Sequence, residues 1–381
     1  MKALIDPREY AALAYCTYMN QASLGLIPRT SVEASVRFLT DVAQHGNLRL
    51  SDQAEARVLD GLRTAAAELL GTPVASVAVV GGASEALGQL AALLSSAGGE
   101  VVLVASDFPS VTYPWLAARD RLGMHIRWVR DTPDHDFTLS LFDAITARTT
   151  VVCVSAVQFA TGSQVDVAAL VARARDVGAR VVVDVTQLAG AAPVAMTQWG
   201  VDALVCSGYK WLSAPSGVAL LAIAEHLAAA IPVIVGWKGS ATPFDFTPQE
   251  LSLAADARRF ELSTMSYSAA MGLLTSIKLL TRIGLTTISD HASALAAELA
   301  ERTAPLGWTP YRAPGEPSAS GHIVSLRRPD AAADQVQAAL ASQHNINTSS
   351  RAGGIRVSLH AYNSSHDIRA LTQALASIGS R

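Results

Sequence analysis

The stretch V-V-V-D-V-T-Q-L-A-G at residues 181–190, followed by A-L-V-C-S-G-Y-K-W-L at residues 203–212, decides which fold this sequence can adopt. Each stretch opens with an apolar run that predicts a buried strand. Asp184 ends the first strand, and Lys210 lies three residues beyond the second. Because parallel strands end at the same edge of a sheet, we expect this carboxylate and this amine to lie close together.

Similar apolar runs alternate with amphipathic stretches from about residue 50 to about residue 225. Apolar strands separated by helices are typical of a mostly parallel sheet that is buried on both faces. The predicted strands are Val77–Val80, Glu100–Ala105, His125–Arg130, Thr150–Ser155, Arg180–Asp184, Ala203–Ser207 and Gly217–Ala222. The predicted helices are Ser84–Ser96, Val111–Leu122, Leu141–Ala147 and Val167–Val177. We therefore expect an α/β protein with a three-layer, mostly parallel sheet.

The pattern changes after Arg259, where long helices are followed by a mixture of strands and helices. The elements predicted there are helices Tyr267–Ile283, Thr287–Pro305, Ala331–Gln343 and His366–Ile378, with strands His322–Arg327 and Gly354–His360. We predict a large domain over residues 15–260 and a smaller α+β domain over residues 261–381. Residues 1–14 are expected to pack against the smaller domain.

The composition excludes several classes of protein. Half of the residues are hydrophobic, 16% are charged and the net charge is −3, which is typical of a globular protein. The sequence has no Lys/Arg run and no long charge-free apolar segment, so we expect neither a nucleic-acid partner nor a membrane partner. The three cysteines form no CxxC and the histidines show no ligand spacing, so we expect no metal site and a reducing, cytoplasmic location.

Lysines are rare, which narrows the search for amine chemistry. Only four of the 29 basic residues are lysines: Lys2, Lys210, Lys238 and Lys278. Lysine can lose its proton and attack a carbonyl, whereas arginine stays charged. A lysine paired with a carboxylate at strand ends suits a Schiff-base enzyme, in which the carboxylate keeps the ring nitrogen of an aldehyde cofactor protonated.

The run S-G-Y-K-W-L around Lys210 resembles the lysine motif of fold-type I enzymes that use pyridoxal 5′-phosphate, specifically the class V aminotransferase group. That group includes cysteine desulfurases, kynureninases and isopenicillin N epimerases, and the resemblance covers roughly residues 17–381. It implies that Lys210 carries the cofactor as an internal aldimine and that Asp184 is the partner of the pyridine nitrogen. Gln187 is implied to lie near the ring hydroxyl. Ser207 and Tyr209 are implied to contact the phosphate.

Three further segments match cofactor positions of the family. G-G-A-S-E-A at residues 81–86 lies between a strand and a helix, where Gly82, Ala83 and Ser84 can hold a phosphate. Phe108 in D-F-P-S resembles the phenylalanine that stacks on the cofactor ring in kynureninases. Thr264 in R-F-E-L-S-T matches a threonine that reaches the phosphate of the neighbouring subunit, which implies a homodimer with a shared active site.

Substrate positions are implied near both ends of the chain. Arg356 in G-G-I-R-V-S-L-H offers a planar fork for the carboxylate of an amino-acid substrate. Asn20 and Ser23 in Y-M-N-Q-A-S-L-G, and Phe159 with its neighbour Gln158, are further candidates. We also expect Trp237 and Lys238 to lie beside the substrate pocket.

Two departures from the family pattern bear on the reaction. The stretch H-N-I-N-T-S-S-R-A-G-G at residues 344–354 has no cysteine where desulfurases carry their sulfur, and Val111 replaces an aspartate of kynureninases. We therefore expect a carbon–sulfur β-elimination lyase that acts on cysteine or an S-substituted cysteine conjugate through a quinonoid. An aminotransferase or an amino-acid epimerase remains open as an alternative. A non-catalytic pyridoxal-phosphate-binding protein is a more remote one.

Overall fold

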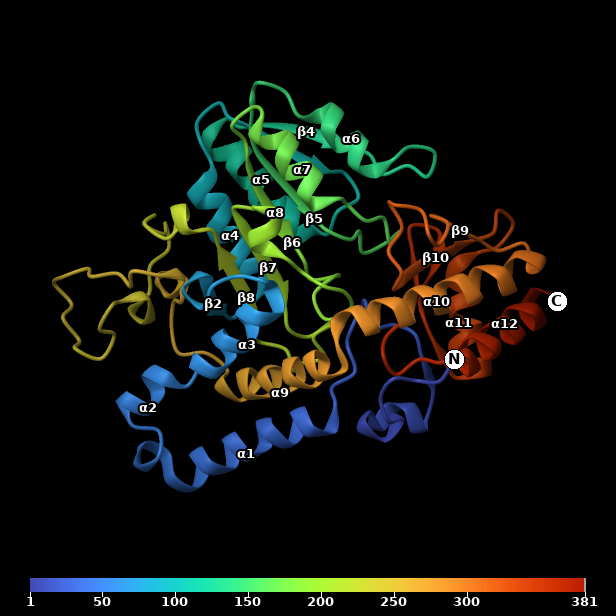
Figure 1. Cartoon of the computed structure of the whole chain (residues 1–381), viewed down its shortest axis with the longest axis horizontal. Helices are drawn as coiled ribbons and strands as arrows, with labels where there is room; N and C mark the ends of the chain where they lie inside the picture. Colours follow the sequence, from blue (N-terminus) through green and yellow to red (C-terminus); the bar gives the residue numbers. More distant parts are fainter. Residues whose placement is uncertain (380–381) are drawn as a thin grey trace.

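A seven-stranded sheet forms the centre of the larger part of the molecule in the computed structural model, which describes residues 1–379 (Figure 1). The strand order is β2-β8-β7-β6-β5-β3-β4. The strands are β2 (Val77–Val80), β3 (Glu100–Val104), β4 (His125–Val129), β5 (Thr149–Ser155), β6 (Arg180–Asp184), β7 (Ala203–Ser207) and β8 (Ala219–Ile223). Only β8 runs antiparallel to its neighbours in this sheet, which confirms the predicted mostly parallel α/β architecture.

Helices cover both faces of this sheet (Figure 1). One face packs against α4 (Ala83–Leu94) and α5 (Pro109–Leu122), where Trp115 lies in one apolar cluster with Leu103. The other face packs against α3 (Asp60–Leu70), α6 (Phe137–Ala144), α7 (Val167–Arg175) and α9 (Tyr267–Ile283). Successive strand residues point to opposite faces, so Val102 joins this second cluster. The result is a three-layer core in which the inner strands are buried along their length, whereas the edge strand β4 remains partly accessible.

The largest differences between the predicted elements and the structure concern α6 and the N-terminal helices. Helix α6 begins at Phe137, four residues before the predicted Leu141, because the Asp136 side chain accepts a hydrogen bond from the Leu139 backbone N–H and caps the helix there. The prediction also omitted α1 (Arg29–His45), α2 (Asp52–Arg57) and α3. Helix α1 packs along α9 and leaves Val32, Val36 and Leu39 exposed on its outer side, so its apolar positions do not mark one buried face.

The C-terminal part contains a four-stranded antiparallel sheet in the order β12-β13-β10-β9. Its strands are β9 (Thr309–Pro310), β10 (Ile323–Arg327), β12 (Ser349–Arg351) and β13 (Gly354–Ser358), and its helices are α10 (Leu285–Thr303), α11 (Ala333–His344) and α12 (Ser365–Gly379). The helices pack on the sheet through one buried apolar cluster, which includes Leu299, Leu340 and Leu371.

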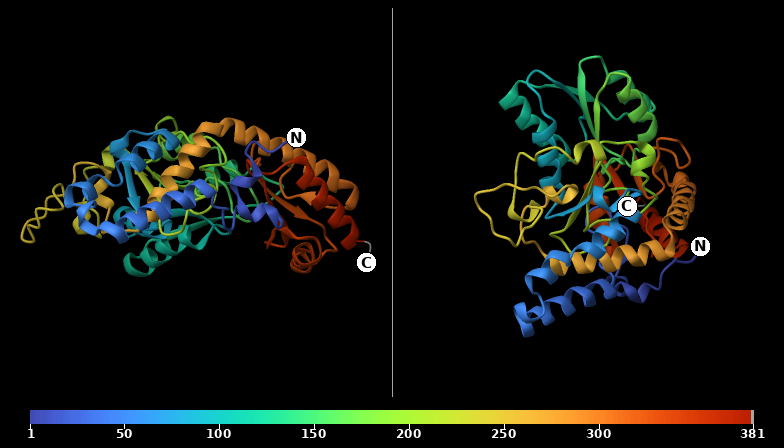
Figure 2. Two further views of the ribbon diagram at one scale, coloured as in Figure 1. Left: turned by 90° about the horizontal axis from the view of Figure 1, so that it is seen from below. Right: turned by 60° about the vertical axis from the view of Figure 1, so that its left-hand side comes forward.

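The N-terminal segment lies against this C-terminal part, as Figures 1 and 2 show. The Leu4 backbone N–H donates to the Ala361 carbonyl at 2.8 Å, and β1 (Thr17–Tyr18) pairs in parallel with β11 (Ile346–Asn347). The chain then crosses to the larger part through residues 19–28. No single helix among residues 1–379 is long and apolar enough to cross a membrane; α9 passes that test only together with the segment Leu285–Leu306, from which it is bent by 74°.

Candidate active site

A cavity of about 430 Å³ lies at the edge of the large sheet where β2, β3, β5, β6 and β7 end. The structure brings ten of the sequence-predicted residues to its wall: Gly82, Ala83, Ser84, Phe108, Phe159, Asp184, Gln187, Ser207, Tyr209 and Lys210. The carboxyl ends of parallel strands lie at the same edge of a sheet. Residues that are far apart in the sequence therefore lie side by side at this edge.

Asp184 and Lys210 are the charged groups in the wall of this cavity. Burial raises the pKa of Asp184 to about 6, although Thr186 and the Lys210 charge act in the opposite direction. Burial lowers the pKa of Lys210 to about 8, although Asp184 opposes this shift. Within residues 1–379, the Lys210 ammonium forms no hydrogen bond or ion pair, so its amine is free to react.

The loop that carries Lys210 is held from the N-terminal segment. Gln21 Nε2 donates to the Lys210 carbonyl and to Ser213 Oγ, each at 2.9 Å. The Gly25 backbone N–H donates to the Tyr209 carbonyl at 2.9 Å, and any side chain at Gly25 would collide with the Lys210 carbonyl oxygen. The position of the reactive amine therefore depends on this close approach of two backbones.

Two aromatic rings form one wall of the cavity. The Phe108 ring centroid lies 4.9 Å from Lys210 Nζ, and Phe108 meets Phe159 edge to face with centroids 5.4 Å apart. Phe108 is fixed at the start of α5, where its backbone N–H donates to Asp107 Oδ1 at 2.7 Å. A flat ring that enters the cavity can stack on Phe108 while the Lys210 amine reaches its edge.

The first turn of α4 supplies hydrogen-bond donors at the opposite end of the cavity. Gly82 is the N-cap residue and no side chain caps the helix, so the backbone N–H groups of Ala83 and Ser84 lack an intrahelical partner. Ser84 Oγ lies 2.6 Å from Ser110 Oγ, which adds two hydroxyls beside these N–H groups. Such a helix start favours a phosphate.

Gln187 is held by three contacts. Its Oε1 accepts from Trp211 Nε1 at 2.7 Å, its Nε2 donates to the Ala22 carbonyl at 3.1 Å, and its own carbonyl accepts from His322 Nε2 at 2.6 Å. These contacts fix the orientation of the side-chain amide and leave one Nε2–H for an oxygen acceptor in the cavity.

The residues of the cavity fit pyridoxal 5′-phosphate. Asp184 offers a carboxylate for the pyridine nitrogen, Phe108 a stacking face and Gln187 a donor for the ring oxygen. The α4 start and Ser207 offer donors for the phosphate, and Lys210 offers the amine. These groups lie on the wall of one cavity. Together they offer a suitable partner for each part of the cofactor, all within reach of a single bound molecule.

Arg356 forms a separate cluster that joins this cavity through Phe159. Its Nη1 donates to the Phe159 carbonyl at 2.7 Å, and its Nη2 donates to Asn20 Oδ1 at 3.3 Å and to Ser23 Oγ. Arg356 is 1% exposed, and its Nε has no hydrogen-bond partner in the described chain. Burial, and then the charge of Arg351, lower the pKa of Arg356 to about 9. All the acceptors of Arg356 are neutral, so its charge is available to a carboxylate ligand.

The sequence did not reveal several polar residues around the cavity. Ser110, Ser155, Thr186 and Ser216 line it, and Asp107 lies behind it. Asp107 accepts from the Ser155 backbone N–H at 2.8 Å, from Ser155 Oγ at 2.6 Å and from Gln158 Nε2 at 3.1 Å. Burial raises the pKa of Asp107, despite these hydrogen bonds. A signal was available, because Ser155 is the last residue of β5 and Asp107 follows β3 closely.

Three residues proposed for the site lie elsewhere in the single chain. Thr264 is exposed and does not line the cavity. Trp237 and Lys238 also lie outside it: Lys238 Nζ pairs with Glu55 Oε1 at 2.7 Å and lies 4.3 Å from the Trp237 ring centroid. Lys238 lines a different hollow, of about 130 Å³.

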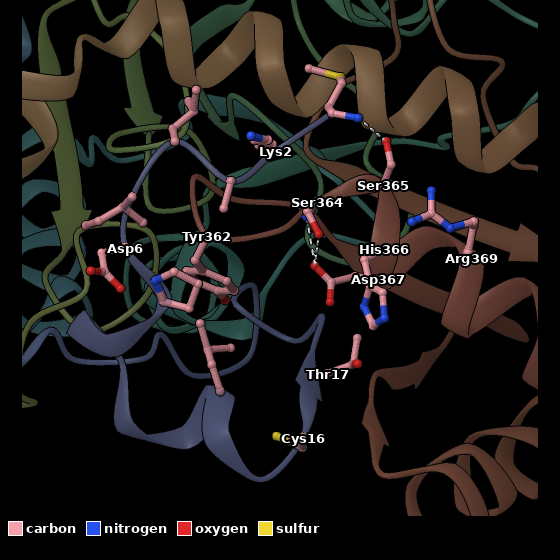
Figure 3. A pocket seen from close by; sticks show the side chains of 16 residues that line it. Lys2, Asp6, Cys16, Thr17, Tyr362, Ser364, Ser365, His366, Asp367 and Arg369 are labelled. Carbon is pink, nitrogen blue, oxygen red and sulfur yellow. Dashed lines mark hydrogen bonds between the residues drawn. The ribbon is translucent and has the colours of Figure 1, made fainter.

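The cysteines also lie away from the cofactor cavity. Cys153 and Cys206 are buried within β5 and β7, and burial raises the pKa of both thiols. Cys16 lines an open hollow of about 920 Å³ between the N-terminal segment and the start of α12 (Figure 3). Burial raises the pKa of the Cys16 thiol as well. None of the sequence-predicted site residues lines this second hollow.

The sequence is similar to a known protein family and to several of its members. A family model described as aminotransferase class-V matches residues 17–371. The uncharacterized aminotransferase YcbU of Bacillus subtilis is 30% identical over 308 residues, which cover 80% of this chain and 79% of that protein. A probable cysteine desulfurase of Aeropyrum pernix is 29% identical over 392 residues, covering 95% of this chain and 94% of that protein.

Solved structures share the fold. The cysteine desulfurase of Thermococcus onnurineus NA1 has a TM-score of 0.87 at 23% identity and covers 98% of this chain and 97% of its own. The cystine C–S lyase C-DES, in complex with its product cysteine persulfide, has a TM-score of 0.85 at 23% identity, covering 96% of this chain and 99% of its own. These likenesses confirm the predicted fold type.

Proposed function

Because the chain belongs to the aminotransferase class-V family and is a pyridoxal-phosphate-dependent enzyme, we propose that it is a lyase that breaks a carbon–sulfur bond. The proposed substrate is cysteine or an S-substituted cysteine. Elimination of the sulfur group followed by hydrolysis gives pyruvate, ammonia and either hydrogen sulfide from cysteine or a thiol from an S-alkyl cysteine, so no sulfur atom has to stay on the protein.

The position of the cysteines carries this choice of reaction. Among residues 1–379, no cysteine lines the cavity that holds Lys210, and the stretch 344–354 has none. A desulfurase that stores sulfur on its own thiol needs that thiol beside the substrate, whereas β-elimination needs a base and a carboxylate anchor. The similarity to a cystine C–S lyase supports the same choice.

The residues of the chain have distinct proposed tasks. When bound, pyridoxal phosphate supplies an electron sink for the charge that develops at the substrate α-carbon. Arg356 holds the α-carboxylate with its planar fork. Lys210 removes the α-proton, and its pKa of about 8 gives it a substantial neutral fraction near physiological pH. Asp184 keeps a negative charge beside the ring nitrogen, and Phe108 covers one face of the ring.

Absorbance spectroscopy and product assays test this proposal. The purified protein with added pyridoxal phosphate should absorb in the visible near-violet, and Lys210→Ala should lose this band. Lys278→Ala removes an exposed lysine on α9 and should keep it. The wild type should release pyruvate and ammonia from each substrate, together with a thiol from an S-alkyl cysteine, hydrogen sulfide from L-cysteine or cysteine persulfide from cystine. Transfer of the amine to a keto acid without release of thiol would refute the lyase.

An aminotransferase is the second candidate, since YcbU is described as an uncharacterized aminotransferase and is 30% identical. Both reactions share the proton removal by Lys210 and the carboxylate contact of Arg356. They differ only in where the proton returns and whether a leaving group departs. The keto-acid arm of the same experiment separates the two.

We also propose that the protein is a cytoplasmic homodimer in which each site is completed by its partner. The exposed Thr264 and the exposed apolar side chains of α1 support the dimer, since both are accessible to a second chain. The three free cysteines support a reducing compartment.

A further inference from the structure

The hairpin of β12 and β13 presents a second arginine on the same face as Arg356. In this antiparallel pair Ser349 lies opposite Arg356, and Arg351 lies opposite Gly354. Residues two apart on a strand point to the same face, so Arg351 and Arg356 are diagonal neighbours on one face of the sheet. Gly354 has no side chain, and the space above it is bordered by Ser325 Oγ and the Leu326 carbonyl of β10.

A tight turn fixes the direction of Arg351. The two residues that connect the strands both have positive φ angles, 47° at Ala352 and 77° at Gly353. This is the backbone of a two-residue hairpin turn, which sets the register of the flanking strands. Arg327 Nη2 donates to the Ala352 carbonyl at 3.1 Å and holds the turn from β10.

Neither arginine has an acidic partner within residues 1–379. Arg356 donates only to neutral oxygens, and its buried Nε has no partner. The Arg351 side chain is exposed, and its hydrogen bond goes to the Ser350 carbonyl at 2.7 Å. Burial, the Arg356 charge and the Arg351 charge each lower the pKa of Lys210. Arg351 therefore acts electrostatically on the reactive amine.

Two like charges on neighbouring positions repel unless anions bind between or beside them. Arg356 is buried against Asn20 and Ser23, which suits the α-carboxylate. Arg351 is exposed at the end of the same strand pair and lines an open hollow with the start of α11, outside the cavity of Lys210. Its charge still acts on both Arg356 and Lys210, so it is placed to meet a group farther out on the substrate. We propose that Arg351 is a specificity residue that binds a second carboxylate, carried by the sulfur substituent. This rests on the proposed lyase function and makes the substrate a cysteine conjugate with an acidic substituent.

A matched pair of ligands tests the charge preference alone. S-carboxymethyl-L-cysteine and S-carbamoylmethyl-L-cysteine have nearly the same size and differ in one negative charge. For each ligand, the concentration that half-saturates the change in cofactor absorbance gives an affinity, and release of pyruvate gives kcat/KM. The wild type should prefer the carboxylate about tenfold or more, as expected for a charge-assisted hydrogen bond.

Arg351→Gln should reduce this preference to about onefold and leave the affinity for the neutral ligand within about twofold. Arg282→Gln removes an exposed arginine on α9 and should keep the wild-type preference. Circular dichroism and thermal unfolding are the folding controls, and the neutral ligand shows whether the loss is specific to the charge. Equal weakening of both ligands by a folded Arg351→Gln protein would show that Arg351 shares the α-carboxylate, and would overturn the proposal.

The same experiment distinguishes failure of the proposed lyase function from failure of the proposed role of Arg351. A carboxylate preference in the absorbance titration with no release of pyruvate or thiol would leave the role of Arg351 standing and refute the lyase. Release of both products with no preference between the two ligands in the wild type would refute the role of Arg351 alone.

Discussion

At the scale of single residues, burial shifts the pKa values of Asp184 and Lys210 in opposite directions. The pKa of Asp184 rises to about 6 and that of Lys210 falls to about 8. Each group is therefore pushed towards its neutral form by its surroundings. At neutral pH the protein without cofactor keeps two buried charges that it stabilises only in part, and the proposed contacts with the cofactor would supply the missing partners.

The shift at Asp184 predicts a pH dependence of stability in the cofactor-free protein. Its folded-state pKa of about 6 exceeds the ordinary aspartate value of 3.8, so the folded state binds this proton more tightly than the unfolded state. The free energy of unfolding should therefore decrease as the pH rises from about 4 to about 6, by up to about 3 kcal/mol. Asp184→Asn should lack this decrease. Urea unfolding at several pH values measures it, and identical pH profiles for the two proteins would contradict the assignment.

Trp211 acts through Gln187. Trp211→Phe removes the donor to Gln187 Oε1 and leaves a buried acceptor unpaired, which should cost about 1–3 kcal/mol of stability. The freed amide can then rotate, so the pH midpoint of the cofactor absorbance band should shift. Trp308→Phe is the matched control, because Trp308 is also buried but its Nε1 has no hydrogen-bond partner in the described chain. An absorbance titration that is unchanged in Trp211→Phe would refute this role.

At the scale of elements, the periodicity of the sequence located the buried strands well. The predicted β6 and β7 agree with the structure because both faces of these strands are apolar and their ends carry polar residues. Helix α1 was not predicted although its sequence is amphipathic, and its apolar residues Val32, Val36 and Leu39 stay exposed in the single chain. The strand-end rule placed Asp184 and Lys210 in one cavity, whereas Ser207 was suggested only by the family resemblance. Asp107 was missed because its role depends on hydrogen bonds to β5, a strand distant in the sequence.

The β12–β13 turn gives a prediction at this scale. Ala352 adopts a φ of 47°, which favours glycine or asparagine, so Ala352→Gly should be neutral or should stabilise the protein by up to about 1 kcal/mol. Gly353→Ala at a φ of 77° should destabilise it by about 1 kcal/mol, although no atom crowds the added methyl group. Thermal unfolding measures both changes. Equal destabilisation by the two substitutions would contradict the turn geometry.

At the scale of the whole molecule, apolar surface on α1 indicates an interface. Val32, Val36 and Leu39 are exposed at helical spacing, and residues 231–235 together with Phe246 and Leu251 add further exposed apolar side chains. Figures 1 and 2 show the latter segment projecting from the larger part of the molecule. Contiguous apolar surface of this kind is typical of association between subunits.

The proposed homodimer predicts the behaviour of charged variants. The wild type should have twice the chain mass of 39.8 kDa in light scattering. Val36→Glu places a charge in the apolar stripe of α1 and should shift the protein towards monomers with weaker cofactor binding. Leu139→Glu, at an exposed position on α6, should remain dimeric. A wild type with the mass of a single chain would refute the shared site.

The contact between Asn20 and Arg356 joins residues that are 336 positions apart in the sequence. Asp184 and Lys210, in contrast, lie close together in the sequence, at the ends of the two adjacent strands β6 and β7. During synthesis on the ribosome, Asp184 and Lys210 can come together on β6 and β7 while the C-terminal part is still missing. The carboxylate anchor needs both ends of the chain. As the chain folds, affinity for the cofactor should therefore appear before affinity for the substrate. The contact between Asn20 and Arg356 forms last, and it completes the proposed substrate site.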